Sequence, residues 1–308
     1  VLSLLLWMIW WIDMGTIISG IGLSTPGFFR RGSIAMEVKA ARECLKNANL
    51  DPNLLGLLVN TGIYRDRHIG EPAIATLIQR EIEANEVFTG NRSTFSFDLT
   101  NGGCGMLTGM MVVDGYLQSG GIDYGMVVTA DVDPAPGKTR GYEFTDAAAA
   151  VLLARHENGG GFLHFKTETD AGAIDDMQGR IEWMEHKGKM RNILVIRQKE
   201  AYAGACARFA LDALDVFLKE ISLKLKDIDL IIPSQSPPGF LRELKKKKGL
   251  EERLIDVTDK LANVHTAGIG FALERAMAAG RFAAAKNCLF LTVGAGLTAS
   301  LALYVNPV

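Results

Sequence analysis

The fold of this chain is decided by the stretch Asn101-Gly102-Gly103-Cys104-Gly105-Met106-Leu107-Thr108-Gly109-Met110-Met111, which sets one cysteine among glycines. Upstream, residues 93–99 alternate apolar and polar side chains, as a strand does. Downstream, residues 106–117 carry apolar side chains at helical spacing, and Gly120-Gly121 ends that pattern. Cys104 is therefore predicted to lie at a helix N-terminus, where free backbone N–H groups and the helix dipole favour the nucleophilic thiolate.

The other three cysteines, Cys44, Cys206 and Cys288, lie within apolar helix or strand patterns. We interpret them as small buried core residues, which is the usual fate of a free cysteine and the alternative for Cys104 too. None of the four forms a Cys-x-x-Cys pair, which argues against a zinc site and against a disulfide scaffold. The pattern predicts a reducing, cytoplasmic location and no metal.

Composition indicates an ordinary globular protein of 308 residues, long enough for one large domain or two fused halves. A net charge of -2 gives no overall attraction to nucleic acid. The opening residues 1–12 are apolar and include Trp7, Trp10 and Trp11, but they are too few to span a bilayer. No basic region precedes them and no small-residue cleavage site follows. We expect an apolar N-terminal extension of residues 1–13 and no membrane span, with a membrane-surface anchor as the alternative.

The chain repeats one order of predicted elements. A helix at 34–47 followed by a strand at 54–60 matches a helix at 203–218 followed by a strand at 227–234. The Cys104 helix with its strand at 124–129 matches a helix that opens at His265, with a strand at 288–293.

Two similar halves, 14–165 and 166–308, predict a doubled α/β domain. Residues 155–197, which are rich in glycine and charge, are interpreted as the joint between them. In such a doubling, Cys104 and His265 occupy equivalent places and can face one another across a pseudo-two-fold axis.

Four further segments, taken with the cysteine helix, carry a family resemblance. They are residues 125–132, Phe144-Thr145-Asp146-Ala147-Ala148-Ala149-Ala150-Val151-Leu152, the His265 helix and Val293-Gly294-Ala295-Gly296-Leu297-Thr298. In this order and spacing the chain resembles the thiolase superfamily, specifically the ketoacyl-acyl-carrier-protein synthase III branch, over nearly all of residues 16–305. The resemblance implies a five-layered αβαβα sandwich built from two duplicated halves, and a homodimer. It also implies an acyl-carrier-protein or coenzyme A thioester as substrate, and no bound cofactor.

By this resemblance, Cys104 attacks an acyl thioester and forms a covalent acyl-enzyme, which divides one hard transfer into two easier ones. The N–H groups of Cys104 and Ala295 match the family's oxyanion hole, each contributing roughly 3 to 4 kcal/mol. His265 is expected to act as a base for Cys104 or as a donor to the enolate oxygen. The alternatives are a simple glycine turn for the Ala295 loop and a structural histidine.

The chain departs from the family pattern at three places. The branch has a catalytic histidine at the position that, by the resemblance, is Ser234 in this chain. A serine hydroxyl can supply a hydrogen bond but is no comparable base. The alternative is a serine of a loop with no catalytic role. Where the branch has an asparagine, this chain has His265, as other thiolases do. The segment 26–33 is much shorter than its counterpart, which puts priming directly from coenzyme A in question.

Glu71 resembles the glutamate that head-to-head acyl-condensing members of the superfamily send across the dimer to deprotonate a second acyl chain. A glutamate before a proline at a helix start is equally good capping chemistry. A basic surface follows later in the chain, and the resemblance implies that it receives the acidic acyl carrier protein, with a solvated helix face as the alternative. Its residues are Arg242, Lys245, Lys246, Lys247 and Lys248.

These observations favour a cytoplasmic, homodimeric acyltransferase that loads Cys104 and forms a β-keto product. Two other functions remain open. One is non-decarboxylative condensation, or acyl transfer to an oxygen or nitrogen acceptor. The other is a non-catalytic subunit paired with an active paralogue.

Overall fold

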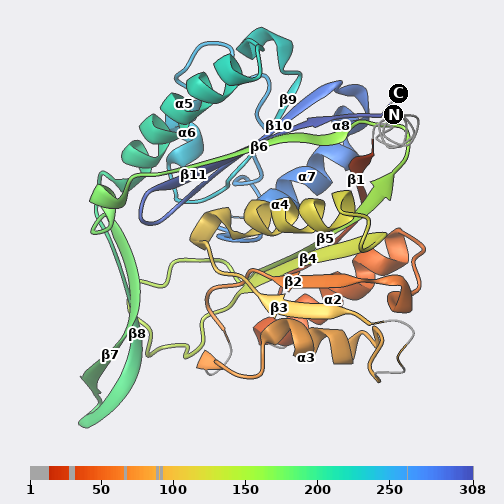
Figure 1. Ribbon diagram of the computed structural model, residues 1–308. Helices are drawn as coiled ribbons and strands as arrows, with labels where there is room; N and C mark the ends of the chain where they lie inside the picture. The colour runs from red at the N-terminus through yellow and green to blue at the C-terminus, as the bar shows by residue number, and fades with distance from the viewer. Residues whose placement is uncertain are drawn as a thin grey trace, which may run out of the picture.

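Among the described residues of this computed structural model (14–27, 32–65, 68–87, 90, 93–261 and 263–307), nine strands form one sheet. Their order is β3-β2-β4-β5-β1-β6-β11-β10-β9 (Figure 1). The predicted extension of residues 1–13 lies outside the described residues. The strands are β1 (Gly15–Ser24), β2 (Leu57–Asn60), β3 (Phe95–Asp98), β4 (Tyr124–Asp131), β5 (Ala147–His156), β6 (Gly161–Thr169), β9 (Leu230–Pro233), β10 (Asn287–Gly294) and β11 (Thr298–Val305).

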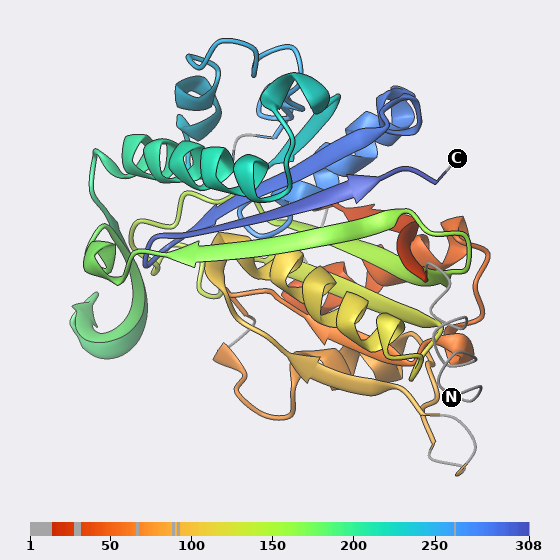
Figure 2. The same ribbon diagram turned by 45° about the horizontal axis from the view of Figure 1, so that its top comes forward.

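Helices cover both faces of this sheet and fill the space between its two halves (Figures 1 and 2). They are α2 (Ser33–Asn47), α3 (Ile74–Glu81), α4 (Gly105–Gln118), α5 (Tyr202–Glu220), α6 (Phe240–Leu244), α7 (Gly268–Ala278) and α8 (Arg281–Ala284).

The two halves of the sheet are built alike around its centre, where β1 and β6 run parallel and pair at Thr16 and Gly161. On one side, β5 is antiparallel to β1, β4 is antiparallel to β5 and β2 is parallel to β4. On the other side, β11, β10 and β9 repeat these relations in the same order. A parallel bridge between Ile231 and Leu254 stands where β3 would be. The repeated order of elements is therefore present, although the division at 165/166 falls inside β6 and stays a prediction.

Alternate side chains of each strand pack against different helical layers. In β5, Ala149 and Val151 join a cluster with α4 and α7, whereas Leu152 joins a cluster with α2 and α3. In β10, Phe290 faces α4 and α7, whereas Leu291 faces α5 and α6. The layers are thus helix, sheet, helix, sheet, helix, with α4 and α7 in the middle, which confirms the five-layered αβαβα sandwich.

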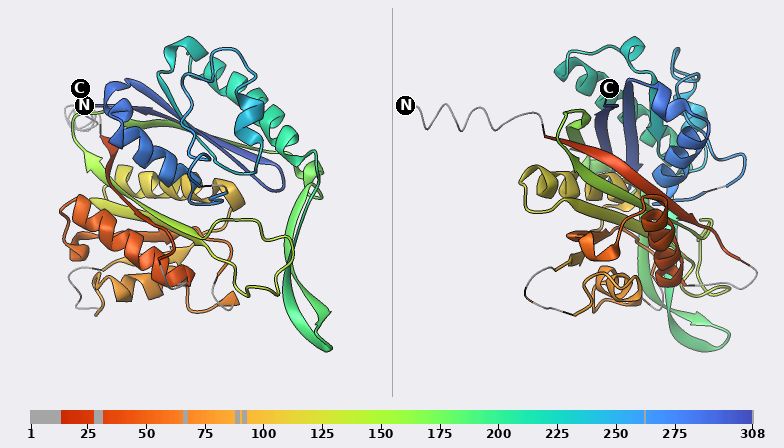
Figure 3. Two further views of the ribbon diagram at one scale, coloured as in Figure 1. Left: turned by 180° about the vertical axis from the view of Figure 1, so that it is seen from behind. Right: turned by 90° about the vertical axis from the view of Figure 1, so that its right-hand side faces the viewer.

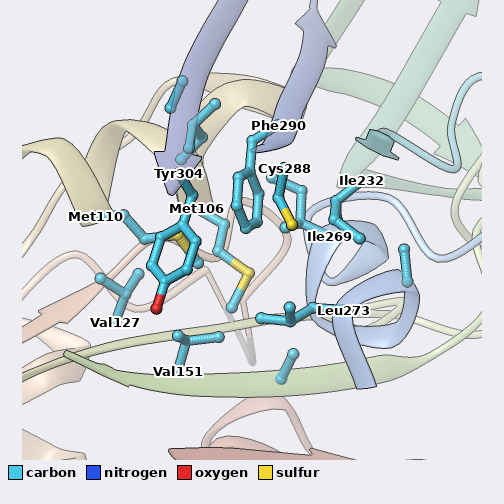
Figure 4. Close-up of a cluster of buried hydrophobic side chains, with 14 of the residues drawn as sticks. Met106, Met110, Val127, Val151, Ile232, Ile269, Leu273, Cys288, Phe290 and Tyr304 are labelled. Carbon is cyan, nitrogen blue, oxygen red and sulfur yellow. The ribbon is translucent and has the colours of Figure 1, made fainter. Parts of the chain in front are cut away.

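Figure 4 shows buried side chains of the middle layer. Met106 and Met110 of α4 meet Leu273 of α7 and Phe290 of β10, all fully buried. The two methionines are therefore core residues. Methionine side chains are unbranched and flexible, so they fill irregular gaps in a core well.

Several element boundaries differ from the sequence prediction. The strand expected from residue 54 begins at Leu57, because Pro52–Leu54 forms a short 3₁₀ helix capped by Asp51. The helix expected over residues 34–47 begins one residue earlier, at Ser33, and Gly32 is its N-cap. The helix expected over residues 203–218 extends from Tyr202 to Glu220.

Residues 155–197, interpreted as a loose joint, contain regular structure. After Gly159, Gly160 and Gly161, which all have positive φ angles, β6 enters the sheet. Beyond it, β7 (Met177–His186) and β8 (Lys189–Gln198) form a separate antiparallel hairpin that extends from the body (Figure 3). The sequence did not reveal these strands because glycines and charges interrupt them, although Ile193 to Ile196 are buried at the base of the hairpin. The assignment of this segment as the joint between the halves stays a prediction.

We expect Phe290→Ala to lower the free energy of unfolding by about 3 to 5 kcal/mol, because a cavity would form between the sheets. Urea denaturation measures the change. The control is Val216→Ala on the exposed face of α5, where the side chain is 47 % exposed. A loss at Phe290 no larger than at Val216 would contradict the packing described above.

Candidate functional site

Cys104 is the last residue of a 3₁₀ turn, Gly102–Cys104, and the N-cap of α4. The predicted helix start is therefore confirmed. The turn is held by two hydrogen bonds. The N–H of Cys104 donates to the carbonyl of Asn101 at 3.0 Å, and the Asn101 amide donates to the Thr108 hydroxyl at 2.9 Å. The N–H expected to stabilise an oxyanion is therefore already engaged inside the turn.

The Cys104 thiol is fully buried and donates to the carbonyl oxygen of Thr298 at 3.5 Å. Burial raises its pKa to about 11, although hydrogen bonds with Thr292 and Ser300 act in the opposite direction. The expectation of a helix start that favours the thiolate was wrong for this conformation. Desolvation outweighs the helix end, because the thiol is enclosed between α4 and the β10–β11 pair.

The loop after β10 packs directly on the cysteine turn. A Cβ atom on Gly103 would lie 2.4 Å from the carbonyl oxygen of Val293, so only glycine fits there. A Cβ atom on Gly102 would lie 3.6 Å from the amide nitrogen of Ala295. The structure thus brings together the two segments that the sequence analysis assigned to the oxyanion hole.

His265 lies in the turn before α7, which begins only at Gly268. Its Nδ1 is 2.8 Å from Oδ2 of Asp131, and its ring stacks on Phe144 with centroids 4.4 Å apart. The side chain is 10 % exposed. Because Asp131 holds Nδ1, the other ring nitrogen, Nε2, is the one available to a substrate.

Asp131 was missed by the sequence analysis, although it is a buried carboxylate at the end of an apolar strand. Besides His265, it accepts backbone N–H groups of Ile63 and Tyr64 at 2.9 and 2.8 Å. It also accepts the Thr266 N–H at 3.2 Å and the Thr266 hydroxyl at 2.6 Å. Burial alone would raise the pKa of Asp131, but the charge of His265 and these hydrogen bonds lower it below its usual value.

Among the described residues, no hydrogen bond or ion pair joins Cys104 to His265. Two aromatic side chains, Tyr64 and Phe144, lie beside the ring of His265. Tyr64 lies 5.7 Å from His265 between ring centroids and shares a buried cluster with Tyr202 and Cys206. Burial raises the pKa of Cys206 to about 12, and the nearby Cys104 adds to that rise. His265 therefore lies beside this cluster at Tyr64, and Cys104 lies near it at Cys206.

Ser234 follows β9 and is 3 % exposed. Its hydroxyl accepts the Val293 N–H at 3.1 Å, and its own N–H donates to Leu291. The side chain therefore ties the end of β9 to β10, next to the loop that carries Ala295. Glu71, by contrast, is exposed on the surface before α3.

The basic run follows α6, and three of its lysines are paired. Lys245 binds Asp256 at 2.8 Å, Lys246 binds Glu243 at 2.5 Å and Lys247 binds Asp215 at 2.6 Å. Three residues of the predicted docking surface, Arg242, Lys246 and Lys248, are exposed. A groove of about 600 Å³ beside them is lined by Gln235, Pro238, Arg242, Lys245 and Asp256, among others.

A second residue missed by the sequence analysis is Asn263, two positions before His265. It is 3 % exposed, and its amide nitrogen donates to the Glu143 carbonyl at 3.3 Å. Its Oδ1 is buried without a hydrogen-bond partner in the described part of the chain. The signal was an asparagine at the opening of the helix that repeats the cysteine helix.

Two family profiles match this chain. The profile described as 3-Oxoacyl-[acyl-carrier-protein (ACP)] synthase III covers residues 97–171, and the corresponding C-terminal profile covers residues 218–305. Relatives named beta-ketoacyl-[acyl-carrier-protein] synthase III match along most of their length. The one from Wolbachia pipientis (strain wPip) is 24 % identical over 271 residues, covering 85 % of this chain and 80 % of the relative. The one from Coxiella burnetii (strain Dugway 5J108-111) is 26 % identical over 274 residues, covering 87 % and 82 %.

This chain belongs to the 3-oxoacyl-[acyl-carrier-protein] synthase III branch of the thiolase superfamily. Solved structures share the fold of the branch. The synthase III of Aquifex aeolicus VF5 superimposes with a TM-score of 0.79 at 21 % identity, covering 95 % of this chain and all of the other. Xanthomonas campestris OleA, crystallised with lauric acid and lauroyl-CoA, gives 0.78 at 17 % identity, covering 95 % and 99 %.

We expect Asp131→Asn to lower the free energy of unfolding by about 1.5 to 3 kcal/mol at pH 7, because it removes a buried carboxylate that accepts hydrogen bonds from Ile63, Tyr64 and Thr266. The pKa of Asp131 is lower in the folded than in the unfolded state, so its contribution is present above its unfolded pKa. The contribution is lost as the pH falls through the folded value. Urea denaturation of both proteins should show a constant difference above about pH 5 that shrinks below about pH 4. A difference that grows on acidification would contradict the lowered pKa of Asp131.

We expect Cys104 in the folded protein to react slowly with iodoacetamide, because a thiol with a pKa of about 11 is almost wholly protonated at pH 8. Peptide mapping by mass spectrometry measures the rate, with the urea-unfolded chain as the fast reference. The rate should rise as the pH approaches 11. Rapid stoichiometric labelling of Cys104 at pH 7 would show that the thiol is not held as described.

Proposed function

We propose that this chain is an acyltransferase of the synthase III type. It takes an acyl group from a thioester onto Cys104 and condenses it with a malonyl or acyl thioester to a β-keto product. The observation that carries the proposal is the direct packing of the cysteine turn on the loop that contains Ala295. Family membership over both halves supports the same reaction class.

Acylation requires the Cys104 thiol to turn away from the Thr298 carbonyl and to lose its proton. The thiolate then adds to the acyl carbonyl carbon, the carbon–sulfur bond of the donor breaks, and the donor leaves as a thiol. Nε2 of His265 can accept the proton, with Asp131 balancing the resulting charge. The Ala295 N–H is the oxyanion donor that lies against the turn.

Condensation then needs a carbon nucleophile. In the decarboxylating version, a malonyl thioester loses carbon dioxide, and its enolate attacks the acyl-enzyme and releases Cys104. Asn263 or His265 can donate a hydrogen bond to the enolate oxygen, whereas Ser234 already accepts the Val293 N–H. In the alternative version, Glu71 from a second subunit deprotonates an acyl thioester, or an oxygen or nitrogen acceptor replaces the carbon nucleophile.

The donor we propose is an acyl carrier protein that docks on Arg242 and residues 245–248, with coenzyme A thioester as the alternative. The groove beside Arg242 supports this site, because Gln235, the residue after Ser234, is among its lining residues. Residues 28–31 of the short segment implicated in coenzyme A binding lie outside the described residues. We also propose a homodimer. A cytoplasmic location is proposed as well, and the four unpaired cysteines support that location. No helix among the described residues is long and apolar enough to cross a membrane.

A non-catalytic subunit paired with an active paralogue is the second candidate, and two observations favour it. The thiol of Cys104 is enclosed and points to Thr298, with a pKa raised to about 11. By the family resemblance, Ser234 takes the place of the branch's histidine, and a serine hydroxyl cannot act as a comparable base. A subunit of this kind would keep the fold without forming an acyl-enzyme.

Mass spectrometry after incubation with acyl-carrier-protein and acyl-coenzyme A thioesters of several lengths tests the proposal. We expect an acyl adduct on Cys104 that is absent in Cys104→Ala, while Cys206→Ala still forms it. If the adduct forms, His265→Ala should slow condensation with malonyl carrier protein about 100-fold or more, and carbon dioxide release measures this step. No adduct with any donor would leave the non-catalytic subunit as the function.

A further inference from the structure

The β10–β11 pair carries two hydroxyl groups on the face that meets the cysteine turn. Thr292 lies directly opposite Ser300 in the register of the two strands. Phe290, two residues before Thr292, and Ala302, two residues after Ser300, both pack into the middle layer with α4. Because alternate residues of a strand share a face, the two hydroxyl groups point into the layer in which Cys104 begins α4.

Both hydroxyl groups are buried and joined to neighbours. Thr292 is 0 % and Ser300 is 2 % exposed. The Thr292 hydroxyl donates to the carbonyl oxygen of Ser300 at 3.2 Å. The Ser300 hydroxyl shares a hydrogen bond of 3.0 Å with the exposed Thr167 of β6, in which either group can be the donor. When Thr167 donates, the Ser300 hydroxyl keeps its own proton for another acceptor.

The thiol of Cys104 is the acceptor that lies nearest to hand. The 3₁₀ turn that holds it contacts both β10 and β11. Its sulfur lies 3.5 Å from the carbonyl oxygen of Thr298, which precedes Ser300 by two positions on the same strand. Hydrogen bonds with the Thr292 and Ser300 side chains lower the pKa of the thiol against the larger effect of burial. A hydrogen bond has this effect when it favours the charged form.

The titratable groups that interact electrostatically with the thiol lie on α5. Burial raises the pKa of Cys206 to about 12, and it raises the pKa of Tyr202 above its usual value. Both side chains are therefore largely neutral where Cys104 ionises. A charge on the sulfur thus meets neutral hydroxyl groups, and a hydrogen bond to an ionised group is about twice as strong as one between neutral groups.

We infer that Thr292 and Ser300 are catalytic donors that hold the thiolate of Cys104. In the neutral enzyme, the thiol and Thr292 each donate to a carbonyl oxygen of β11. When the S–H bond breaks, its proton passes to Nε2 of His265, and both hydroxyl groups donate to the sulfur. Thr167 then donates to Ser300 and completes the chain of hydrogen bonds. The use of this thiolate in acyl transfer rests on the proposed function.

Alkylation of Cys104 by iodoacetamide between pH 8 and pH 11, followed by peptide mapping, tests this inference. Thr292→Val and Ser300→Ala should each slow alkylation at pH 8 about 10-fold, and the double variant about 100-fold, because a hydrogen bond to a charged group is lost each time. Thr292→Ser keeps the hydroxyl and should restore most of the rate.

The matched control is Thr169→Val. Thr169 lies on β6 two positions from Thr167, and its hydroxyl pairs with that of Thr298 instead of Ser300. This control should change the rate less than about 2-fold. Circular dichroism melting should show that all variants remain folded.

The pH profile separates ionisation of the thiol from access to it. The ratio of wild-type to variant rates should be constant at low pH and should shrink near pH 11, where the wild-type thiol ionises. If the two hydroxyl groups only hold the strands together, their loss changes access and gives the same ratio at every pH.

A ratio that does not depend on pH, or rates in Thr292→Val and Ser300→Ala equal to that of Thr169→Val, would overturn the inference. The acyl adduct is measured separately. If the wild-type chain forms it, the two hydroxyl variants should form it about 10-fold more slowly at pH 8. No adduct with any donor overturns the proposed function, and the alkylation profile still decides whether the two hydroxyl groups hold the thiolate.

Discussion

The carboxylate of Asp131 is the interaction on which the arrangement of the site depends. It ends β4 in the first half and binds both the segment after β2 and the turn before α7 in the second half. Three pieces of chain that are distant in sequence are therefore fixed by one buried charge. Because a carboxylate in this position is stable only with all its donors present, the position of His265 is set as firmly as that of the strand that carries Asp131.

The cysteine turn has a different physical basis. Its position follows from glycines that let the turn and the loop after β10 approach at backbone distance, and no side chain is involved in that approach. The same close approach encloses the thiol and directs it to Thr298. Close backbone packing and an accessible nucleophile are thus in opposition here, and the chemistry proposed for the chain requires a local rearrangement of the thiol.

The sequence predicted the fold well where a residue's neighbours are local. The buried strands β4 and β10 were found from continuous apolar runs, and the start of α4 from glycines around Cys104. The sequence failed where the neighbours are remote. The pKa of Cys104 depends on β10 and β11, and Thr298 lies 194 residues away. Asp131 was missed because its partner His265 lies 134 residues away. The β7–β8 hairpin was missed because glycines and charged residues interrupt the apolar positions of its strands.

The pairing of β1 with β6 at the centre of the sheet affects how the two halves are held together. The backbone contact between β1 and β6 is recorded at one residue pair, Thr16 and Gly161, so few main-chain hydrogen bonds cross from one half to the other. Cohesion between the halves comes from the side chains of α4 and α7 instead. A substitution in that layer is therefore felt on both sides of the molecule, whereas the cluster beneath α2 contains residues of the first half alone.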